Sequence, residues 1–207
     1  STEAPTVWPR LSFNNEVGCP LTVLRADRST RYLVLEMGAS AEGELAYLTD
    51  IAPLDVAVVL MVGRAHLGGF GVRQMQGSAP EPVVTFSAAG SERASFRAED
   101  AHLDPLGHAQ FSVVDEQGDS FPVELGLVGA HQVGNALAVV AAAAALGVPP
   151  EAAVRGLQGL RAGSPHRMDV RELELPGGAR FTLVDDSYNA NPDSMRAAFA
   201  LARRLAG

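Results

Sequence analysis

The sequence contains no lysine, so all 16 of its basic side chains are arginines. This absence excludes a phosphate-binding loop of the Gly-x-x-x-x-Gly-Lys-Ser/Thr type from these 207 residues. Cysteine occurs once, at Cys19, which excludes an internal disulfide and fits a reducing cytosol. The neighbouring Gly18 and Pro20 offer no base or cation to activate the thiol, so a buried structural role is favoured.

Long hydrophobic runs and an excess of positive charge are also lacking. The longest apolar stretch, residues 136–148, is mostly alanine and is too short to cross a bilayer, so we expect no membrane insertion. The first residues show no basic segment followed by an apolar one, so we expect no signal peptide. The net charge of −8 argues against a general nucleic-acid binder, which needs a basic face. Phosphate ligands remain compatible with this charge, because backbone N–H groups, magnesium and a few arginines can bind them locally.

Two continuous apolar runs that end in glycine predict buried parallel strands, at residues 32–38 and 56–63. Between them, residues 41–51 have leucines at helical spacing and end before Pro53. A strand–helix–strand unit of this kind is typical of an α/β fold with a mostly parallel sheet. Ligands of such sheets bind at the carboxyl ends of the strands, where Glu36 and His66 are expected.

The middle of the chain has a different pattern. A small antiparallel sheet is predicted from four short segments, 83–86, 94–97, 110–114 and 121–125. A glycine in residues 115–119 suits a hairpin turn between the last two segments. An alanine-rich helix is predicted at 134–146, closed by Gly147, and a second helix at 151–160.

A second α/β domain is predicted to begin near residue 164, so the expected domains are 1–163 and 164–207. Strands are predicted at 168–175 and 179–184, followed by a polar loop and a helix at 193–205. Asp193 or Ser194 can cap that helix.

Two residues are candidate metal ligands. Glu36 follows an apolar strand, where a carboxylate is costly to bury unless it is paired or bound to a metal such as magnesium; the alternative is a solvated side chain, and position alone does not separate the two. His66 lies in a glycine-rich loop that lets backbone approach a ligand closely. Imidazole is a less common magnesium ligand than oxygen, and a lone loop histidine is more often simply solvated.

Several polar residues are candidate binding groups. The run from Asp185 to Ser194 is the densest polar segment after a strand, and we favour ribose or phosphate recognition over a simple capped loop. Arg167 lies at the predicted domain junction, where pockets tend to form. Asn135 opens the alanine-rich helix, where a cap is the simpler explanation. Ser12, Asn14 and Asn15 either cap a following helix or bind a polar ligand.

In this order and spacing the motifs resemble the Mur ligase family, in particular its members that join D-alanyl-D-alanine to a UDP-linked tripeptide. The resemblance spans essentially the whole chain and is carried by Ser12-Phe-Asn-Asn-Glu-Val-Gly18, Leu35-Glu-Met-Gly38, Val62-Gly-x-Ala-His-Leu-Gly-x-Phe-Gly71, Gly129-x-His-Gln-Val-x-Asn135, His166-Arg-Met168 and Asp185-Asp-x-Tyr-Asn-Ala-Asn-Pro-Asp-Ser-Met195. Each motif is weak by itself, whereas the collinear set is strong.

The resemblance implies a Mur-type central ATPase domain and the beginning of a Rossmann-like C-terminal domain. It implies a cytoplasmic peptide ligase that uses ATP and Mg²⁺ and forms an acyl phosphate on UDP-N-acetylmuramoyl-tripeptide before D-alanyl-D-alanine attacks; we expect a monomer. It also implies residue roles. Glu36 and His66 would hold magnesium and act in catalysis, and Asn135 would contact adenine. The remaining expected groups are Arg167 for phosphate, Asp185 and Asp186 for ribose, Tyr188, Asn189 and Asn191 beside the nucleotide cleft, and Ser12, Asn14 and Asn15 for the UDP-sugar-peptide.

The sequence departs from the family pattern in several places. The family's phosphate loop with its lysine precedes the Ser-Phe-Asn-Asn motif, and here it is absent. A segment after about residue 73, which carries a modified lysine in the family, is also absent, and Arg64 replaces a small threonine-like residue.

Three explanations compete for these departures: the sequence is an incomplete view of a longer active ligase, a trimmed piece of one, or a natural homologue that has lost ATP hydrolysis. The first is favoured, because the losses fall at loops and domain edges. The rival functions are a non-catalytic Mur-ligase-like binding protein and a different ligase of the Mur or folylpolyglutamate type, and the run Asn189-Ala-Asn-Pro192 disfavours the latter.

Overall fold

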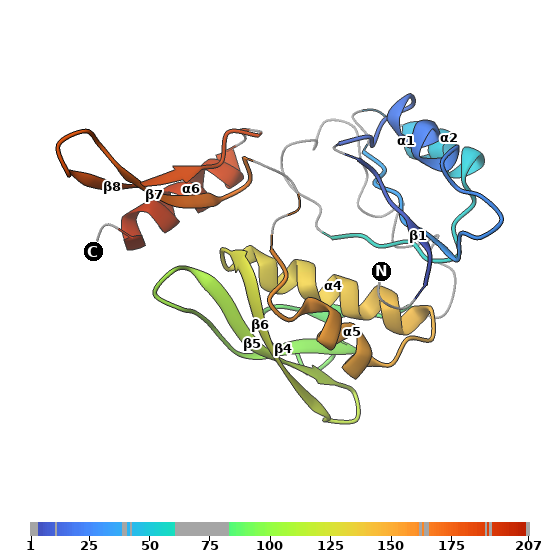
Figure 1. Ribbon diagram of the computed structural model, residues 1–207. Coiled ribbons are helices and arrows are strands. Elements are labelled where there is room, and N and C mark those ends of the chain that lie inside the picture. Colours follow the sequence, from blue (N-terminus) through green and yellow to red (C-terminus); the bar gives the residue numbers. More distant parts are fainter. Residues whose placement is uncertain are drawn as a thin grey trace. The chain divides into compact units, whose positions relative to one another are not determined.

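The computed structural model describes residues 4–10, 12–38, 41, 43–60, 83–161, 163, 166–188, 190 and 192–205. The chain divides into two compact units, Ser1–Glu81 and Pro82–Gly207, which are described separately (Figure 1). The predicted domain boundary at residues 163 and 164 lies inside the second unit and stays a prediction. No helix within the described segments has the length and apolar character needed to cross a membrane.

The first unit contains a two-stranded parallel sheet and two helices. Its elements are β1 (Thr6–Val7), α1 (Gly18–Val23), β2 (Tyr32–Leu33) and α2 (Glu44–Ile51). Thr6 pairs in parallel with Tyr32 and Val7 with Leu33. A strand is therefore confirmed within the predicted range 32–38, although β2 is shorter, and its partner β1 was not predicted from the sequence. Leu48 of α2 is 1% exposed, and Cys19 of α1 is fully buried, as the lack of a neighbouring base or cation in the sequence predicted.

The predicted buried strand at 56–63 is wrong for the residues that the structure describes there. Residues 56–60 have no strand conformation, and Val58, Val59 and Leu60 are 47%, 53% and 60% exposed. An apolar run forms a buried parallel strand only when neighbouring strands satisfy its backbone and helices cover its faces. No described strand pairs with 56–60, so the apolar pattern alone does not produce the strand.

The second unit is built on a four-stranded sheet in the order β3-β4-β5-β6. Its strands are β3 (Phe86–Ser87), β4 (Phe96–Leu103), β5 (His108–Asp115) and β6 (Ser120–Val128). The last three form the predicted antiparallel sheet, while β3 pairs with β4 in parallel. The hairpin turn between β5 and β6 is stabilised by Asp115, whose Oδ1 accepts hydrogen bonds from the N–H groups of Gln117 and Asp119 at 3.0 and 2.9 Å.

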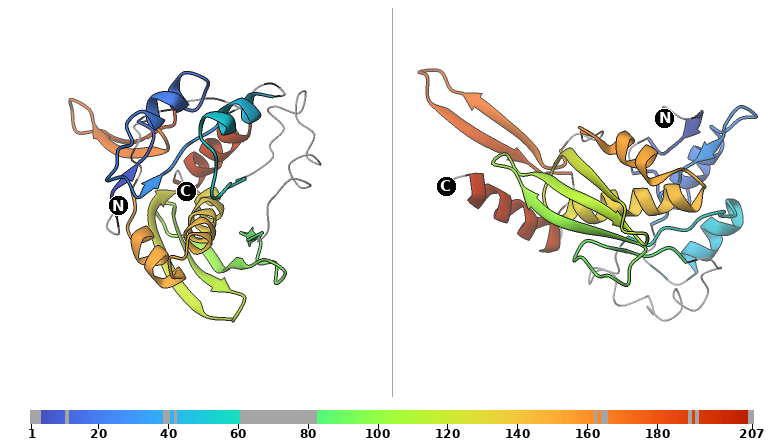
Figure 2. Two further views of the ribbon diagram at one scale, coloured as in Figure 1. Left: turned by 90° about the vertical axis from the view of Figure 1, so that its right-hand side faces the viewer. Right: turned by 90° about the horizontal axis from the view of Figure 1, so that it is seen from below.

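Helices α4 (His131–Ala145) and α5 (Pro150–Leu157) pack on one face of this sheet (Figures 1 and 2). Val133, Leu137 and Val140 recur at helical spacing and pack into one cluster with apolar residues of β4, β5 and β6. Helix α4 ends in a Schellman motif: the N–H of Val148 donates to the Ala143 carbonyl at 2.9 Å, and Gly147 has a φ of 79°. The predicted glycine stop is therefore confirmed.

The chain then forms a hairpin of β7 (Asp169–Glu174) and β8 (Arg180–Asp185), followed by helix α6 (Pro192–Leu205). The hairpin is antiparallel, with Asp169 opposite Asp185 at its open end and Glu174 opposite Arg180 next to the turn. All three elements lie within two residues of their predicted bounds. The described fold is thus mixed α/β, with the small antiparallel sheet that the sequence predicts.

Candidate functional site

The loop before α1 is linked by hydrogen bonds to the segment after β2. Asn14 donates from Nδ2 to Oε1 of Glu36 at 3.0 Å, and its carbonyl accepts a hydrogen bond from the N–H of Gly38 at 2.8 Å. A Cβ at Gly38 would lie 3.1 Å from Nδ2 of Asn14, so a larger residue would require a small shift of this amide. The structure therefore brings Asn14 together with the candidate metal ligand Glu36.

Asn15 has a structural task at the start of α1. Its Oδ1 accepts hydrogen bonds from the N–H groups of Val17 and Gly18 at 3.2 and 2.8 Å. This Asx turn satisfies backbone donors that the helix itself leaves unpaired. Ser12 contributes its carbonyl, which accepts from the N–H of Asn14 at 3.0 Å.

Glu36 is exposed and offers a carboxylate, which is the kind of oxygen ligand that Mg²⁺ prefers. Its predicted partner His66 lies outside the described residues. Among the residues that the structure describes, no three His, Cys, Asp or Glu side chains gather closely enough to hold a metal ion. Magnesium often takes only one or two protein carboxylates and completes its shell with water and phosphate oxygens, so Glu36 fits such a role.

Asn135 lies inside α4 and not at its start, so the interpretation of this residue as a helix cap is wrong. The helix begins earlier than predicted, at His131, and its N-cap position is Ala130. The side chain of Asn135 instead donates from Nδ2 to Oε1 of Gln132 at 3.0 Å, and Nε2 of Gln132 lies 3.1 Å from Nε2 of His131. The three side chains form a short polar chain on the first turns of α4.

His131 packs against Gly129, which has a φ of 110°. A Cβ at Gly129 would lie 2.7 Å from Cε1 of His131, closer than such atoms can approach. Burial lowers the pKa of His131 below its usual value, and the negative charge of Asp186 opposes this effect. A neutral ring can accept the hydrogen bond from the Gln132 amide, so the lowered pKa agrees with the polar chain.

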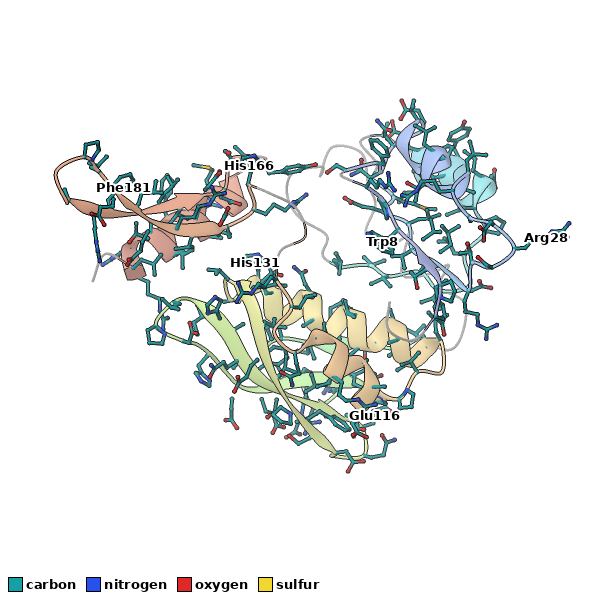
Figure 3. The ribbon with its side chains drawn as sticks, in the orientation of Figure 1. Trp8, Arg28, Glu116, His131, His166 and Phe181 are labelled. Atoms are coloured by element: carbon teal, nitrogen blue, oxygen red, sulfur yellow. The ribbon has the colours of Figure 1, made fainter. Side chains whose placement is uncertain are left out.

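A second cluster forms at the open end of the β7–β8 hairpin, where Figure 3 labels His166. His166 Nδ1 lies 2.7 Å from Oδ2 of Asp185, and the His166 carbonyl accepts a hydrogen bond from the N–H of Tyr188 at 3.0 Å. The N–H of Met168 donates to Oδ1 of Asp186 at 3.0 Å. The turn at residues 166–168 is therefore fixed onto the loop at 185–188 at three points.

Both oxygens of Asp185 are engaged. Oδ2 faces His166, while Oδ1 accepts from the N–H and Oγ of Ser187 at 3.2 and 2.7 Å. The hydrogen bonds from Ser187, and then that from His166, lower the pKa of Asp185 to about 2, so the group is a carboxylate at neutral pH.

Arg167 lies between two residues with left-handed backbone conformations, His166 with a φ of 62° and Met168 with a φ of 48°. Such φ values are uncommon for non-glycine residues and are unfavourable for a bulky side chain such as methionine. Cζ of Arg167 stands 4.1 Å from the centroid of the Tyr188 ring, a cation–π contact. Asn189 and Asn191, predicted to line the same cleft, lie outside the described residues.

The sequence interpretation missed the partners of these groups. It used His166, Gln132 and His131 only as parts of motifs. The i, i+3 spacing of Gln132 and Asn135 on a predicted helix could have indicated their contact. A cavity of about 380 Å³ in the second unit is lined by none of the predicted site residues; its walls are Ala88, Ala101, His102, Leu103, Ala130, Val133 and Arg204.

Comparison with known proteins agrees with the motif order. Residues 5–76 match the family described as "Mur ligase middle domain". A relative from Mycobacterium tuberculosis, named UDP-N-acetylmuramoyl-tripeptide–D-alanyl-D-alanine ligase, is 39% identical over 219 residues, which cover 92% of this chain and 42% of the relative. The chain belongs to the Mur ligase family. A Bacillus subtilis Mur ligase of the same name is 32% identical and covers 95% of this chain and 46% of its own length.

Solved structures of Mur ligases give the same result. MurF from Acinetobacter baumannii matches with a TM-score of 0.80 and 32% identity, over 98% of this chain and 49% of that one. A MurF ligase from Thermotoga maritima, solved in complex with ADP, matches with a TM-score of 0.71 and 26% identity, over 98% of this chain and 52% of that one. The chain thus spans about half the length of the Mur ligases it matches.

Proposed function

We propose that this chain is the central, ATP-handling part of an amide ligase that adds D-alanyl-D-alanine to UDP-N-acetylmuramoyl-tripeptide. The observation that carries the proposal is that relatives with this name align over more than nine tenths of the chain at 32–39% identity. The ADP complex of the Thermotoga relative supports nucleotide binding by this fold. In the proposed reaction the terminal tripeptide carboxylate takes a phosphoryl group from ATP, and the amine of D-alanyl-D-alanine then displaces phosphate.

The described residues suit separate tasks in this reaction. Glu36, oriented by its hydrogen bond from Asn14, would hold magnesium together with His66. Magnesium, when bound, would neutralise charge on the transferring phosphate. Asn14 and Ser12 lie in the loop proposed to face the UDP-sugar-peptide, and Asn15 shapes that loop by starting α1.

The nucleotide would be bound by residues of the second unit. Arg167 would contact its phosphates, since a guanidinium forms strong charge-assisted hydrogen bonds with phosphate oxygens. Asp186 is the better candidate of the two aspartates for the ribose hydroxyls, because both oxygens of Asp185 are engaged by His166 and Ser187. Asn135 would contact adenine from the first turns of α4, with Tyr188, Asn189 and Asn191 beside the cleft.

The absence of the phosphate loop is compatible with this proposal if the sequence is a piece of a longer ligase. The alignment with the Mycobacterium tuberculosis relative runs over 219 positions, more than the 207 residues of this chain. The relative therefore has residues inside the aligned stretch that this chain does not contain. This supports the expectation of missing internal segments.

A phosphate-release assay tests the proposal on the longest natural polypeptide that contains this sequence. We expect release that requires ATP, Mg²⁺, UDP-N-acetylmuramoyl-tripeptide and D-alanyl-D-alanine together, with formation of the corresponding pentapeptide seen by mass spectrometry. Omission of any one substrate should reduce release to background. Phosphate release that ignores D-alanyl-D-alanine would contradict the assigned acceptor.

A non-catalytic binding protein is the second candidate, favoured by the absence of lysine. Without a P-loop lysine the β- and γ-phosphates lose a positively charged partner in phosphoryl transfer. Binding of UDP-tripeptide without any turnover in the same assay would support this candidate over the ligase.

A further inference from the structure

The guanidinium of Arg167 rests on the ring of Tyr188 and has no other side-chain partner in the described part of the chain. We propose that Tyr188 and the His166–Asp185 pair are positioning groups that hold Arg167 ready for an anionic phosphate ligand. The identity of that ligand as a nucleotide rests on the proposed function. The positioning itself rests on the contacts among residues 166–168 and 185–188 alone.

The contact with Tyr188 leaves the hydrogen-bonding capacity of Arg167 intact. Cζ lies 4.1 Å from the ring centroid, so the ring attracts the cation through its π face and accepts none of its N–H groups in a conventional hydrogen bond. The guanidinium has five N–H donors in a planar fork, which suits bidentate binding of phosphate oxygens. An arginine held in this way is restricted in direction while its donors stay available.

The backbone of the turn adds a second restriction. His166 and Met168 on either side of Arg167 both have positive φ. For a bulky residue such as Met168 this backbone conformation is energetically unfavourable. Three hydrogen bonds from the loop at 185–188 oppose relaxation, at 2.7 Å between His166 and Asp185, 3.0 Å to the His166 carbonyl and 3.0 Å to a carboxylate of Asp186. The direction in which Arg167 leaves the backbone therefore depends on this loop.

Asp185 and Asp186 have different tasks in this arrangement. Asp185 receives hydrogen bonds on both oxygens from Ser187 and His166, so it serves the turn. Asp186 uses Oδ1 for the N–H of Met168, and none of the described residues donates to its other oxygen. The neighbouring carboxylates are thus divided into one that positions Arg167 and one that remains able to accept a hydrogen bond from a ligand.

The test follows the Nε–Hε group of Arg167 by ¹H–¹⁵N NMR in the ¹⁵N-labelled 207-residue chain, with its signal assigned through Arg167→Gln. We expect an upfield ring-current displacement in the wild type. The displacement should be lost in Tyr188→Leu and retained in Tyr188→Phe, which keeps the ring. Tyr47→Leu is the matched control, since Tyr47 is likewise an exposed tyrosine and should leave the Arg167 signal in place.

The second half of the test concerns the turn. His166→Ala and Asp185→Asn should each reduce the displacement of the Arg167 signal while the rest of the spectrum, including the α4 amides, stays as in the wild type. An Arg167 signal that is unchanged in Tyr188→Leu, or in both turn variants, overturns the proposal.

A binding measurement separates this proposal from the proposed function. Titration of the longest natural polypeptide that contains this sequence with Mg·ATP should give a dissociation constant about two- to five-fold higher for Tyr188→Leu than for the wild type, with Tyr188→Phe close to the wild type. If Mg·ATP does not bind the wild-type polypeptide, its nucleotide role fails, and the NMR result still decides whether Tyr188 positions Arg167. If the NMR signal moves and the affinity does not, positioning for phosphate is refuted.

Discussion

The contact between Gly129 and His131 makes Gly129→Ala a sharp test of the start of α4. Two costs add in this variant. Gly129 has a φ of 110°, where a residue with a Cβ is strained by about 1–3 kcal/mol. The new Cβ would also lie 2.7 Å from Cε1 and 2.8 Å from Nδ1 of His131, so the ring must leave its place. Movement of the ring would break its contact with Gln132 and disturb the amide of Asn135.

Two control variants separate these costs. Gly118→Ala introduces a Cβ at a φ of 86° with no atom within 4 Å, so it shows backbone strain alone. Gly129→Ala combined with His131→Ala keeps the strain at residue 129 and removes the ring. We expect Gly129→Ala to lower the free energy of unfolding by about 2–4 kcal/mol and the double variant to recover about 1 kcal/mol relative to it.

Equilibrium urea unfolding, with unchanged m-values as a condition, provides the measurement. The NMR signals of the Asn135 side-chain amide should shift in Gly129→Ala and stay in place in Gly118→Ala. A loss of stability in Gly129→Ala no greater than in Gly118→Ala would refute the steric role of His131. An unshifted Asn135 amide would refute the polar chain that links the two residues.

Three further predictions concern the core, the turn and the proposed metal ligand. Leu137→Ala should cost about 2–5 kcal/mol in urea unfolding because Leu137 is fully buried, whereas Leu146→Ala, at 46% exposure, should cost far less. Asp185→Asn should be less stable than the wild type at neutral pH. Because the folded-state pKa of Asp185 is about 2, this difference in the free energy of unfolding should shrink as pH falls from about 4 to 2. A difference that stays constant over that range in urea titrations would contradict this prediction. Glu36→Ala in the longer ligase should abolish phosphate release and leave UDP-tripeptide binding largely intact by calorimetry, and loss of both would argue against a metal role.

Local signals predicted the second unit well. The alanine run before Gly147 and Pro149 predicted a helix that the structure places at His131–Ala145, and the glycine near Asp115 predicted the β5–β6 hairpin. These elements depend on neighbours in the sequence, such as turn residues and helix stops, and on one apolar face. The same logic failed for 56–60, because a buried parallel strand needs partner strands that its own residues do not determine.

The sequence predicted which residues form the candidate site, but it did not predict which of them are in contact. Motif resemblance selected Arg167, Asp185 and Tyr188, but the pairing of His166 with Asp185 joins residues 19 positions apart and follows no local spacing. The positive φ values at His166 and Met168 were equally invisible, since neither residue type favours them strongly. Similarly, Asn135 was assigned to a helix start because the helix was predicted to begin at residue 134, whereas it begins at His131 and Val133 of its first turn packs in the core.

The register of the β7–β8 hairpin has a consequence for how this sequence can vary. Asp169 pairs with Asp185 only because the turn at Pro176–Ala179 keeps a fixed number of residues between the two strands. A slip of one residue would turn the side chain of every following position to the opposite face and carry Asp185 away from His166. The turn contains Gly177 and Gly178, whose φ values of 109° and 85° favour glycine, so its composition is constrained. Its length is constrained as well, because the length of this distant turn decides which carboxylate meets the histidine beside Arg167.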